Sequence, residues 1–74
     1  MKSDLDPNTG KKLGEAFKVA REKNKLTQVD VAKAARMTTN YYAMIERGEA
    51  NPTTSKLLRV IQALKIKSFD LAKL

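Results

Sequence analysis

The 74-residue chain contains no cysteine and no histidine. These absences exclude disulfide bonds, thiolate zinc sites and imidazole ligands, and they exclude acid–base catalysis by histidine. A chain without cysteine fits the reducing cytoplasm, where we expect the protein to act. We therefore expect no metal site, no cofactor and no small-molecule effector.

Long hydrophobic runs and glycine-rich loops are also missing. No apolar stretch approaches the roughly 20 residues that a membrane-spanning helix needs, and residues 1–10 lack the apolar core of a signal peptide. The three glycines, Gly10, Gly14 and Gly48, form no loop that could cradle a phosphate. We therefore expect one small domain that is neither a membrane protein nor an enzyme.

Charged residues are abundant, and most of them are basic. The formal net charge is +7, from 15 basic and 8 acidic side chains. The net charge is +4 over residues 11–25 and +3 over residues 49–74, but only +1 over residues 26–48 and −1 over residues 1–10. A polyanionic partner would explain a basic excess on both sides of a central segment. A lysine-rich surface that serves only solubility would give the same totals.

Helical periodicity begins after a turn-rich start. Residues 1–10 are aperiodic and end in Asp-Pro-Asn-Thr-Gly, which predicts a flexible N-terminal arm. From residue 11 onward, apolar side chains recur at helical spacing and predict a first helix that ends near Asn24, with Asn8 or Thr9 as its N-cap. The expected inner residues of this helix are Leu13, Ala16, Phe17 and Ala20.

Two short helices are predicted next, over about residues 27–35 and 38–47. Thr27 with Asp30 three residues later is a variant of the capping box, and Thr38 is the expected N-cap of the second helix. Gly48 occupies the position at which a left-handed residue ends a helix. The expected inner residues are Val31, Ala32 and Ala35 in the first helix and Tyr42 and Ile45 in the second.

The last third of the chain predicts two more helices. Pro52 interrupts the pattern, and a helix then starts at Thr53 or Thr54. Its expected inner residues are Leu57, Leu58, Ile61 and Leu64, with Val60 beside them. Ser68 would cap a short final segment. Since no stretch alternates as a strand would, the prediction is an all-α, compact five-helix domain over residues 11–74 with a helix-turn-helix at its centre.

Five short motifs in order point to a known family: Leu26-Thr27-Gln28, Val31-Ala32, Ile45-Glu46-Arg47-Gly48, Asn51-Pro52 and Ala63-Leu64. With these motifs the chain resembles the Cro and phage-repressor type of helix-turn-helix protein, also called the xenobiotic-response-element (XRE) family, from about Leu13 to Leu71. The resemblance implies the lambda-repressor-like fold, in which the second and third helices bind DNA. It also implies that Arg21 and Glu46 form an internal ion pair with a structural role.

One position departs from the family pattern. The family commonly has glycine in the turn where this chain has Arg36. That backbone position often needs a positive φ, which costs a non-glycine residue on the order of 1 kcal/mol. Either the turn is strained or Arg36 is retained for its charge beside the DNA backbone, and the sequence leaves both explanations open.

In this family the helix that corresponds to residues 38–47 reads base edges in the major groove. The resemblance places Thr39, Asn40 and Met44 at base-contacting positions, with Ala43 beside them. The Asn40 amide can pair with N6 and N7 of adenine, whereas Met44 offers only an apolar contact to a thymine methyl group. The alternatives are a surface role without a partner for Asn40, and a core or protein-contact role for Met44.

A second set of side chains would contact phosphates, which fixes the register on DNA without reading its sequence. These residues lie at the starts of the two short helices and in the turns that follow them: Thr27, Gln28, Arg36, Thr38, Tyr41, Arg47 and Asn51. If one subunit neutralises about four phosphates, log K would fall against log salt with a slope of roughly −3.6.

We therefore expect a sequence-specific regulator of transcription, a repressor, that binds double-stranded DNA. One subunit reads few base pairs, so we expect a homodimer on a pseudo-palindromic operator, with Ile66, Phe69 and Leu74 as dimer contacts. Such a protein would be cytoplasmic and associated with the nucleoid when bound to DNA. The alternative is a protein- or RNA-binding adaptor of the same fold, such as a co-activator or an antitoxin, because a fold does not settle function.

Overall fold

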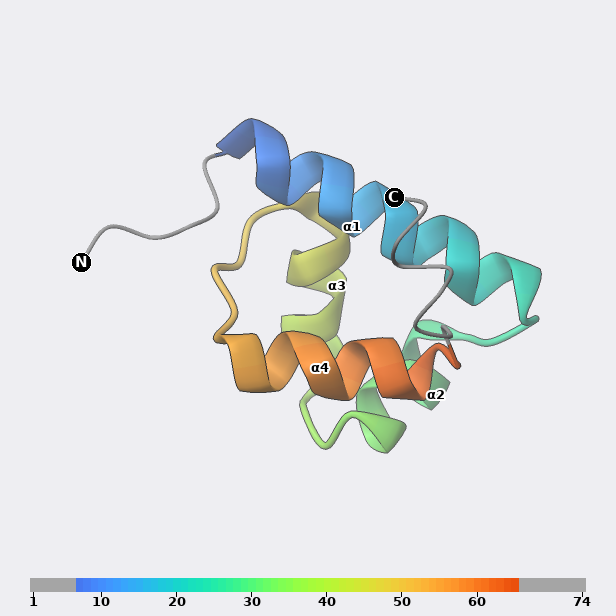
Figure 1. Cartoon of the computed structure of the whole chain (residues 1–74). Helices are drawn as coiled ribbons and strands as arrows, with labels where there is room; N and C mark the ends of the chain where they lie inside the picture. The colour runs from blue at the N-terminus through green and yellow to red at the C-terminus, as the bar shows by residue number, and fades with distance from the viewer. Residues whose placement is uncertain (1–6, 66–74) are drawn as a thin grey trace.

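The computed structural model describes residues 7–65, and within them the chain forms four α-helices and no strand (Figure 1). The helices are α1 (Pro7–Lys23), α2 (Gln28–Ala34), α3 (Thr39–Arg47) and α4 (Thr54–Ala63). α3 packs against α1 and α2, and α2 also packs against α4. The fifth helix that we expected falls on residues 66–74, outside the described residues. Residues 7–65 therefore form an all-α fold with four helices, whereas we predicted five for the chain.

α1 begins four residues earlier than we predicted, at Pro7 instead of residue 11. Residues 7–10, which we assigned to the flexible N-terminal arm, form the first turn of α1, and neither Asn8 nor Thr9 is its N-cap. Proline is favoured at the first helical position because its φ is already near the helical value and its missing N–H would have no partner there. The prediction of an arm over residues 1–10 was therefore wrong for its last four residues.

Threonine side chains cap the other three helices. In the capping box of α2, the Asp30 N–H donates to Thr27 Oγ1 at 3.0 Å and the Thr27 N–H donates to the Asp30 carboxylate at 2.8 Å. The backbone hydrogen bond from Thr27 lowers the pKa of Asp30 below its ordinary value. Thr38 caps α3 and Thr53 caps α4, each by accepting a bond from the N–H three residues later. The capping residues predicted for α2 and α3 are confirmed, and α4 starts at Thr54, one of the two positions that we predicted.

The turn between α2 and α3 depends on a left-handed residue at Arg36, whose φ is +58°. The Arg36 N–H donates to the carbonyl oxygen of Lys33, and the Met37 N–H donates to that of Ala32, so the last carbonyl groups of α2 are paired. A left-handed conformation costs a non-glycine residue about 1–2 kcal/mol. The turn is therefore strained, and because the Arg36 side chain is also exposed, the strain does not exclude a role for its charge.

Side chains from all four helices and their ends build one hydrophobic core. Its fully buried residues are Phe17, Val31, Ala32, Ala35, Tyr42, Ile45, Val60 and Leu64. The inner residues predicted for the two short helices are all among them. The two alanines let neighbouring helices approach the α2 backbone closely, since a methyl group occupies little space.

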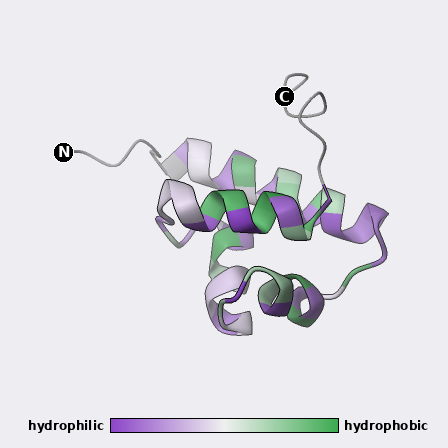
Figure 2. Ribbon diagram, turned by 60° about the horizontal axis from the view of Figure 1, so that its bottom comes forward, coloured by the Kyte–Doolittle hydropathy of each residue, from purple (hydrophilic) through white to green (hydrophobic). Residues whose placement is uncertain are grey.

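α4 turns to the core the face that we predicted, with the exception of Leu58. Val60 and Leu64 are fully buried and Leu57 and Ile61 half-buried, but Leu58 is 53% exposed. Positions 57, 60, 61 and 64 follow the i, i+3, i+4, i+7 spacing of one helix face, and position 58 lies about 100° further round the helix than position 57. Figure 2 shows hydrophobic and hydrophilic residues alternating along α4. The prediction that Leu58 is an inner residue was wrong.

α1 and α3 approach each other closely at Gly14. A Cβ atom here would press against the carbonyl oxygens of Ile45 and Glu46, which belong to a helix backbone and cannot rotate away. Nearby, Gly48 (φ +75°) fits against the backbone of Lys11. Glycine at these two positions permits the contact. We predicted that Gly48 ends its helix, but we assigned no role to Gly14.

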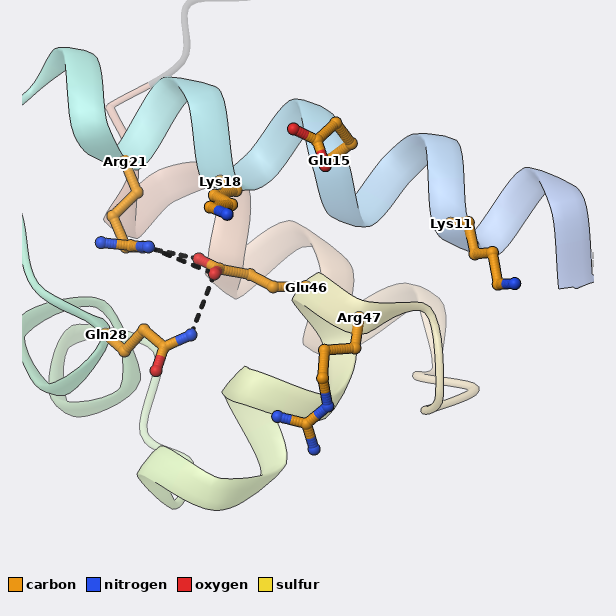
Figure 3. Close-up of a pocket in the computed structure, with 7 residues that line it drawn as sticks. All are labelled: Lys11, Glu15, Lys18, Arg21, Gln28, Glu46 and Arg47. Carbon is orange, nitrogen blue, oxygen red and sulfur yellow. Dashed lines mark hydrogen bonds and ion pairs between the residues drawn. The ribbon is translucent and has the colours of Figure 1, made fainter.

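A largely buried ion pair connects the same two helices (Figure 3). Arg21 Nε donates to Glu46 Oε2 at 2.6 Å and Arg21 Nη2 donates to Glu46 Oε1 at 3.3 Å, which is the pair that the resemblance implied. Gln28 Nε2 also donates to Glu46 Oε1, at 2.9 Å, and Arg21 Nη1 donates to the carbonyl oxygen of Leu26 at 3.0 Å. The Glu46 carboxylate thus joins α1, α2 and α3.

These hydrogen bonds decide the charge of Glu46. Burial by itself would raise the pKa of Glu46, but the hydrogen bonds from Arg21 and Gln28 favour the carboxylate and hold the pKa below its ordinary value. Burial raises the pKa of the neighbouring Tyr42 well above its ordinary value. The Tyr42 hydroxyl also lowers the pKa of Glu46, although its oxygen has no hydrogen-bond partner among residues 7–65. Glu46 is therefore ionised and Tyr42 neutral at pH 7.

Gly14→Ala is expected to lower the free energy of unfolding by about 1–3 kcal/mol, because the added methyl group must push α1 away from α3. Gly10→Ala is the matched control: Gly10 is also buried on α1, but its Cβ would lie 3.7 Å from the carbonyl oxygen of Gly48, an ordinary contact. Alanine there should raise stability by about 0.5–1 kcal/mol through helix propensity. Urea denaturation measures both changes, and equal effects would contradict the close contact at Gly14.

Glu46→Gln is expected to destabilise the domain at pH 7 by about 3–5 kcal/mol, because it leaves the charge of Arg21 largely buried without a counter-charge. The pKa of Glu46 is lowered by folding, so its contribution is present above the unfolded-state value near 4.5 and is lost as the pH falls through the folded-state value.

The difference in unfolding free energy between wild type and Glu46→Gln should therefore shrink from pH 7 to pH 3, as urea denaturation would show. Asp30→Asn is the control, because its pKa is also lowered but its carboxylate is exposed; its difference from wild type should change less. A constant difference for Glu46→Gln would contradict an ionised Glu46 in the folded state.

Candidate nucleic-acid interface

α2, the turn at residues 35–38 and α3 form a helix-turn-helix. α3 buries Tyr42, Ile45 and Glu46 on the side that faces α1 and α2. Thr39 and Asn40, in its first turn, are exposed. The leading end of α3 therefore presents polar side chains to solvent, while its other side is held by the core and by the ion pair.

The four residues predicted to contact bases lie along one side of α3. Thr39 and Asn40 are exposed, and Ala43 and Met44 are half-buried; residues three and four positions apart are neighbours on a helix surface. Asn40 Nδ2 lies 3.9 Å from Met44 Sδ, which is a weak N–H···S contact. This contact leaves the Asn40 amide oxygen and its second N–H uncommitted within the described chain, and these are the groups that pair with adenine.

Tyr41 is less exposed than we predicted. We expected it to point outward with its hydroxyl near a phosphate, but the residue is half-buried and packs against the edge of the core. Lys56 Nζ lies 4.8 Å from the centre of its ring, within the range of a cation–π interaction. Thr38 is exposed, and its hydroxyl oxygen accepts the Tyr41 N–H at 3.0 Å. Tyr41 therefore links α3 to α4 in addition to lining the surface.

Gln28 is bound to the interior, although we predicted that it contacts a phosphate. It is half-buried, and its amide donates to Glu46. The neighbouring Thr27 is exposed, with its hydroxyl oxygen engaged in the capping box. The second N–H of Gln28 and the hydroxyl proton of Thr27 are the donors that these bonds leave for a phosphate.

The remaining phosphate candidates are exposed at the ends of α2 and α3. Arg36 follows α2, and Asn51 lies in the loop between α3 and α4. Arg47 ends α3, and its Nε donates to Glu49 Oε1 at 3.0 Å, with both side chains more than half exposed. We did not predict this ion pair, because it depends on the turn at Gly48 that brings two nearby residues side by side.

A groove between α1 and the helix-turn-helix was also not predicted. It has a volume of about 670 Å³, and Figure 3 shows the side chains around it. α1 contributes four of them, and α2 and α3 contribute the others: Lys11, Glu15, Lys18, Arg21, Gln28, Glu46 and Arg47. Positions 11, 15 and 18 share a helix face by their spacing, but the net charge of a segment does not show that this face lies beside α2 and α3.

The described residues contain no group of three or more acidic side chains that could hold a metal ion. Within residues 7–65, no helix combines the length and the apolar character needed to cross a bilayer. Ile66, Phe69 and Leu74, the predicted dimer contacts, lie outside the described residues.

A solved structure has the same fold. The crystal structure of the restriction-modification controller protein C.AhdI from Aeromonas hydrophila is similar to this chain with a TM-score of 0.76 and 26% sequence identity. The likeness covers 82% of this chain and 92% of that chain. It extends over nearly the whole of the controller chain.

Two proteins of Bacillus phage phi105 are similar in sequence. The immunity repressor protein is 42% identical over 55 residues, and the ImmF control region 10 kDa protein is 41% identical over 51 residues. These alignments cover 74% and 69% of this chain but only 38% and 57% of the two relatives. The chain therefore spans less than two thirds of the length of either phage protein.

The family model described as helix-turn-helix matches residues 17–71, which is most of the chain. The matched segment includes the capped α2, the strained turn at Arg36 and the whole of α3. The chain belongs to the helix-turn-helix family, of the Cro and phage-repressor type.

Proposed function

We propose that this protein is a regulator of transcription, and specifically a repressor, that binds double-stranded DNA by placing α3 in the major groove. The observation that carries the proposal is the exposed polar end of α3, where Thr39 and Asn40 face solvent while Tyr42, Ile45 and Glu46 fix the opposite side. The major groove, about 12 Å wide, accepts one helix held in this way. Such a protein acts in the cytoplasm, at the nucleoid.

Similarity to known regulators supports this proposal. One relative is named as a phage immunity repressor, and the structural neighbour is named as a controller of a restriction-modification system. The net charge of +7 adds support, because phosphate neutralisation supplies most of the non-specific part of DNA affinity.

Specificity for bases, in this proposal, comes from one amide and a small apolar surface. Asn40 would accept from N6 of adenine through its amide oxygen and donate to N7 through the N–H that Met44 does not occupy. Met44 and Ala43 would contact thymine methyl groups, and Thr39 would bond to a base edge or contact a methyl group. The half-burial of Met44 and Ala43 fits an apolar contact better than a polar one.

Phosphate contacts would come from both ends of the helix-turn-helix. Their side chains surround the leading and trailing ends of α2 and α3: Thr27, Gln28, Arg36, Thr38, Tyr41, Arg47 and Asn51. Arg36 offers an exposed charge with no ion pair among the described residues. The charge of Arg47 is partly offset by Glu49, and Gln28 offers one N–H. We expect these groups to orient α3 and not to read bases.

Selection of bound sequences from a random duplex library tests the function and the role of Asn40 together. Wild type is expected to select a pseudo-palindromic site with at least a thousandfold preference over random DNA and a steep salt dependence. Asn40→Ala should lose about 1–3 kcal/mol, or roughly 5- to 150-fold, on that site and should accept any base at the position that Asn40 reads.

Gln62→Ala is the control, because Gln62 is an exposed amide on α4 and should change neither affinity nor selected site. If Asn40→Ala weakens binding equally on every DNA sequence, Asn40 contacts a phosphate and does not read a base. If the protein selects no DNA sequence and instead binds a protein partner with little dependence on salt, the result favours the adaptor function over the regulator.

We further propose that the protein binds its operator as a homodimer, with Ile66, Phe69 and Leu74 at the contact. Leu58, on the last described helix, is 53% exposed and supplies further apolar surface for a second copy. Phe69→Ala should then weaken operator binding in a gel-shift titration more than it lowers the melting temperature. If Phe69→Ala lowers the free energy of operator binding no more than the free energy of folding, this role is refuted. Leu58→Ala, which removes apolar surface from a described position, is the variant for comparison with Phe69→Ala.

A further inference from the structure

α1 presents a row of charged side chains along one side of the helix-turn-helix. Lys11, Glu15 and Lys18 are spaced by four and three residues, so they share a helix face, and all three line the groove in Figure 3. Arg21, one turn further along the same face, points into the groove and reaches Glu46. Lys12, the immediate neighbour of Lys11, does not line the groove.

The charges around this groove are not equally available to a ligand. Arg21 is paired with Glu46, and Arg47 is paired with Glu49. Lys11 and Lys18, in contrast, form no ion pair with any residue from 7 to 65, and Lys18 is exposed. Two ammonium groups therefore remain to attract an anion, with the Glu15 carboxylate between them in sequence.

The groove lies next to the two ends of the unit that would contact DNA. Gln28, at the start of α2, and Arg47, at the end of α3, both line it. A helix inserted in the major groove has phosphate backbone on both sides, so groups that flank the two ends of the helix-turn-helix meet phosphates. α1 is therefore placed to reach the same backbone as Gln28 and Arg47.

We propose that α1 is a third element of the DNA interface, in which Lys11 and Lys18 bind backbone phosphates beside the base pairs that α3 reads. This inference rests on the proposed function. Glu15 opposes these contacts by charge repulsion and limits the affinity for DNA of any sequence. Because lysine binds phosphate as a point charge, these contacts strengthen binding without changing the selected bases.

Salt titrations of operator binding test the proposal with variants that differ only in the position of the charge. Lys11→Gln and Lys18→Gln should each make the slope of log K against log salt shallower by about 0.9 per subunit and weaken binding equally on all sequences. Lys12→Gln, from the adjacent exposed position on α1, should leave the slope unchanged. Glu15→Gln should strengthen binding to operator and to random DNA alike. Urea denaturation of each variant separates these effects from a loss of folding.

Neutral methylphosphonate linkages, placed one at a time in the operator, identify the phosphates. A linkage that weakens wild type but has no further effect on Lys18→Gln marks the phosphate that Lys18 contacts, by the logic of a double-mutant cycle. If wild type binds its site but Lys11→Gln and Lys18→Gln behave as Lys12→Gln does, the inference is wrong and the proposed function stands. The same conclusion holds if every linkage weakens wild type and Lys18→Gln equally. If wild type binds no duplex, the proposed function itself fails.

Discussion

The carboxylate of Glu46 is the point at which three of the four described helices meet. It accepts two hydrogen bonds from Arg21 of α1 and one from Gln28 of α2 while it belongs to α3. A buried carboxylate is costly unless its oxygens are paired, because removal from water penalises the charged form. The three bonds outweigh that cost and keep Glu46 ionised. They also fix α3 relative to the other two helices, so the exposed end of α3 has a defined direction.

The same approach of α1 to α3 creates the basic groove. Gly14 lets α1 lie against the carbonyl groups of Ile45 and Glu46, and this contact carries the charged face of α1 alongside the helix-turn-helix. Of the four cations at the groove, Arg21 and Arg47 are paired with carboxylates, whereas the two lysines of α1 have no ion pair among residues 7–65. Stability and electrostatics are therefore coupled: the contact that buries the ion pair also positions the lysines.

Local chemistry made several features predictable. The capping box of Thr27 and Asp30, the caps at Thr38 and Thr53 and the left-handed Gly48 all depend on hydrogen bonds or dihedral angles within a few residues. Helical spacing predicted the buried faces of α2 and α3 for the same reason. The start of α1 at Pro7 is harder to predict, because the preference of proline for the first helical position competes with the turn-like composition of residues 6–10.

The sequence by itself determined where α2, α3 and α4 begin, which side of α3 is buried and which polar residues lead it, because these depend on neighbours along one helix. Only the tertiary structure decided that Gln28 bonds to Glu46, that Gly14 is a contact point, that Leu58 is exposed and that Lys11 and Lys18 line a groove. These features depend on the distance and rotation between helices that are far apart in the chain. Spacing within one helix does not specify either quantity, since both result from the packing of all the helices at once.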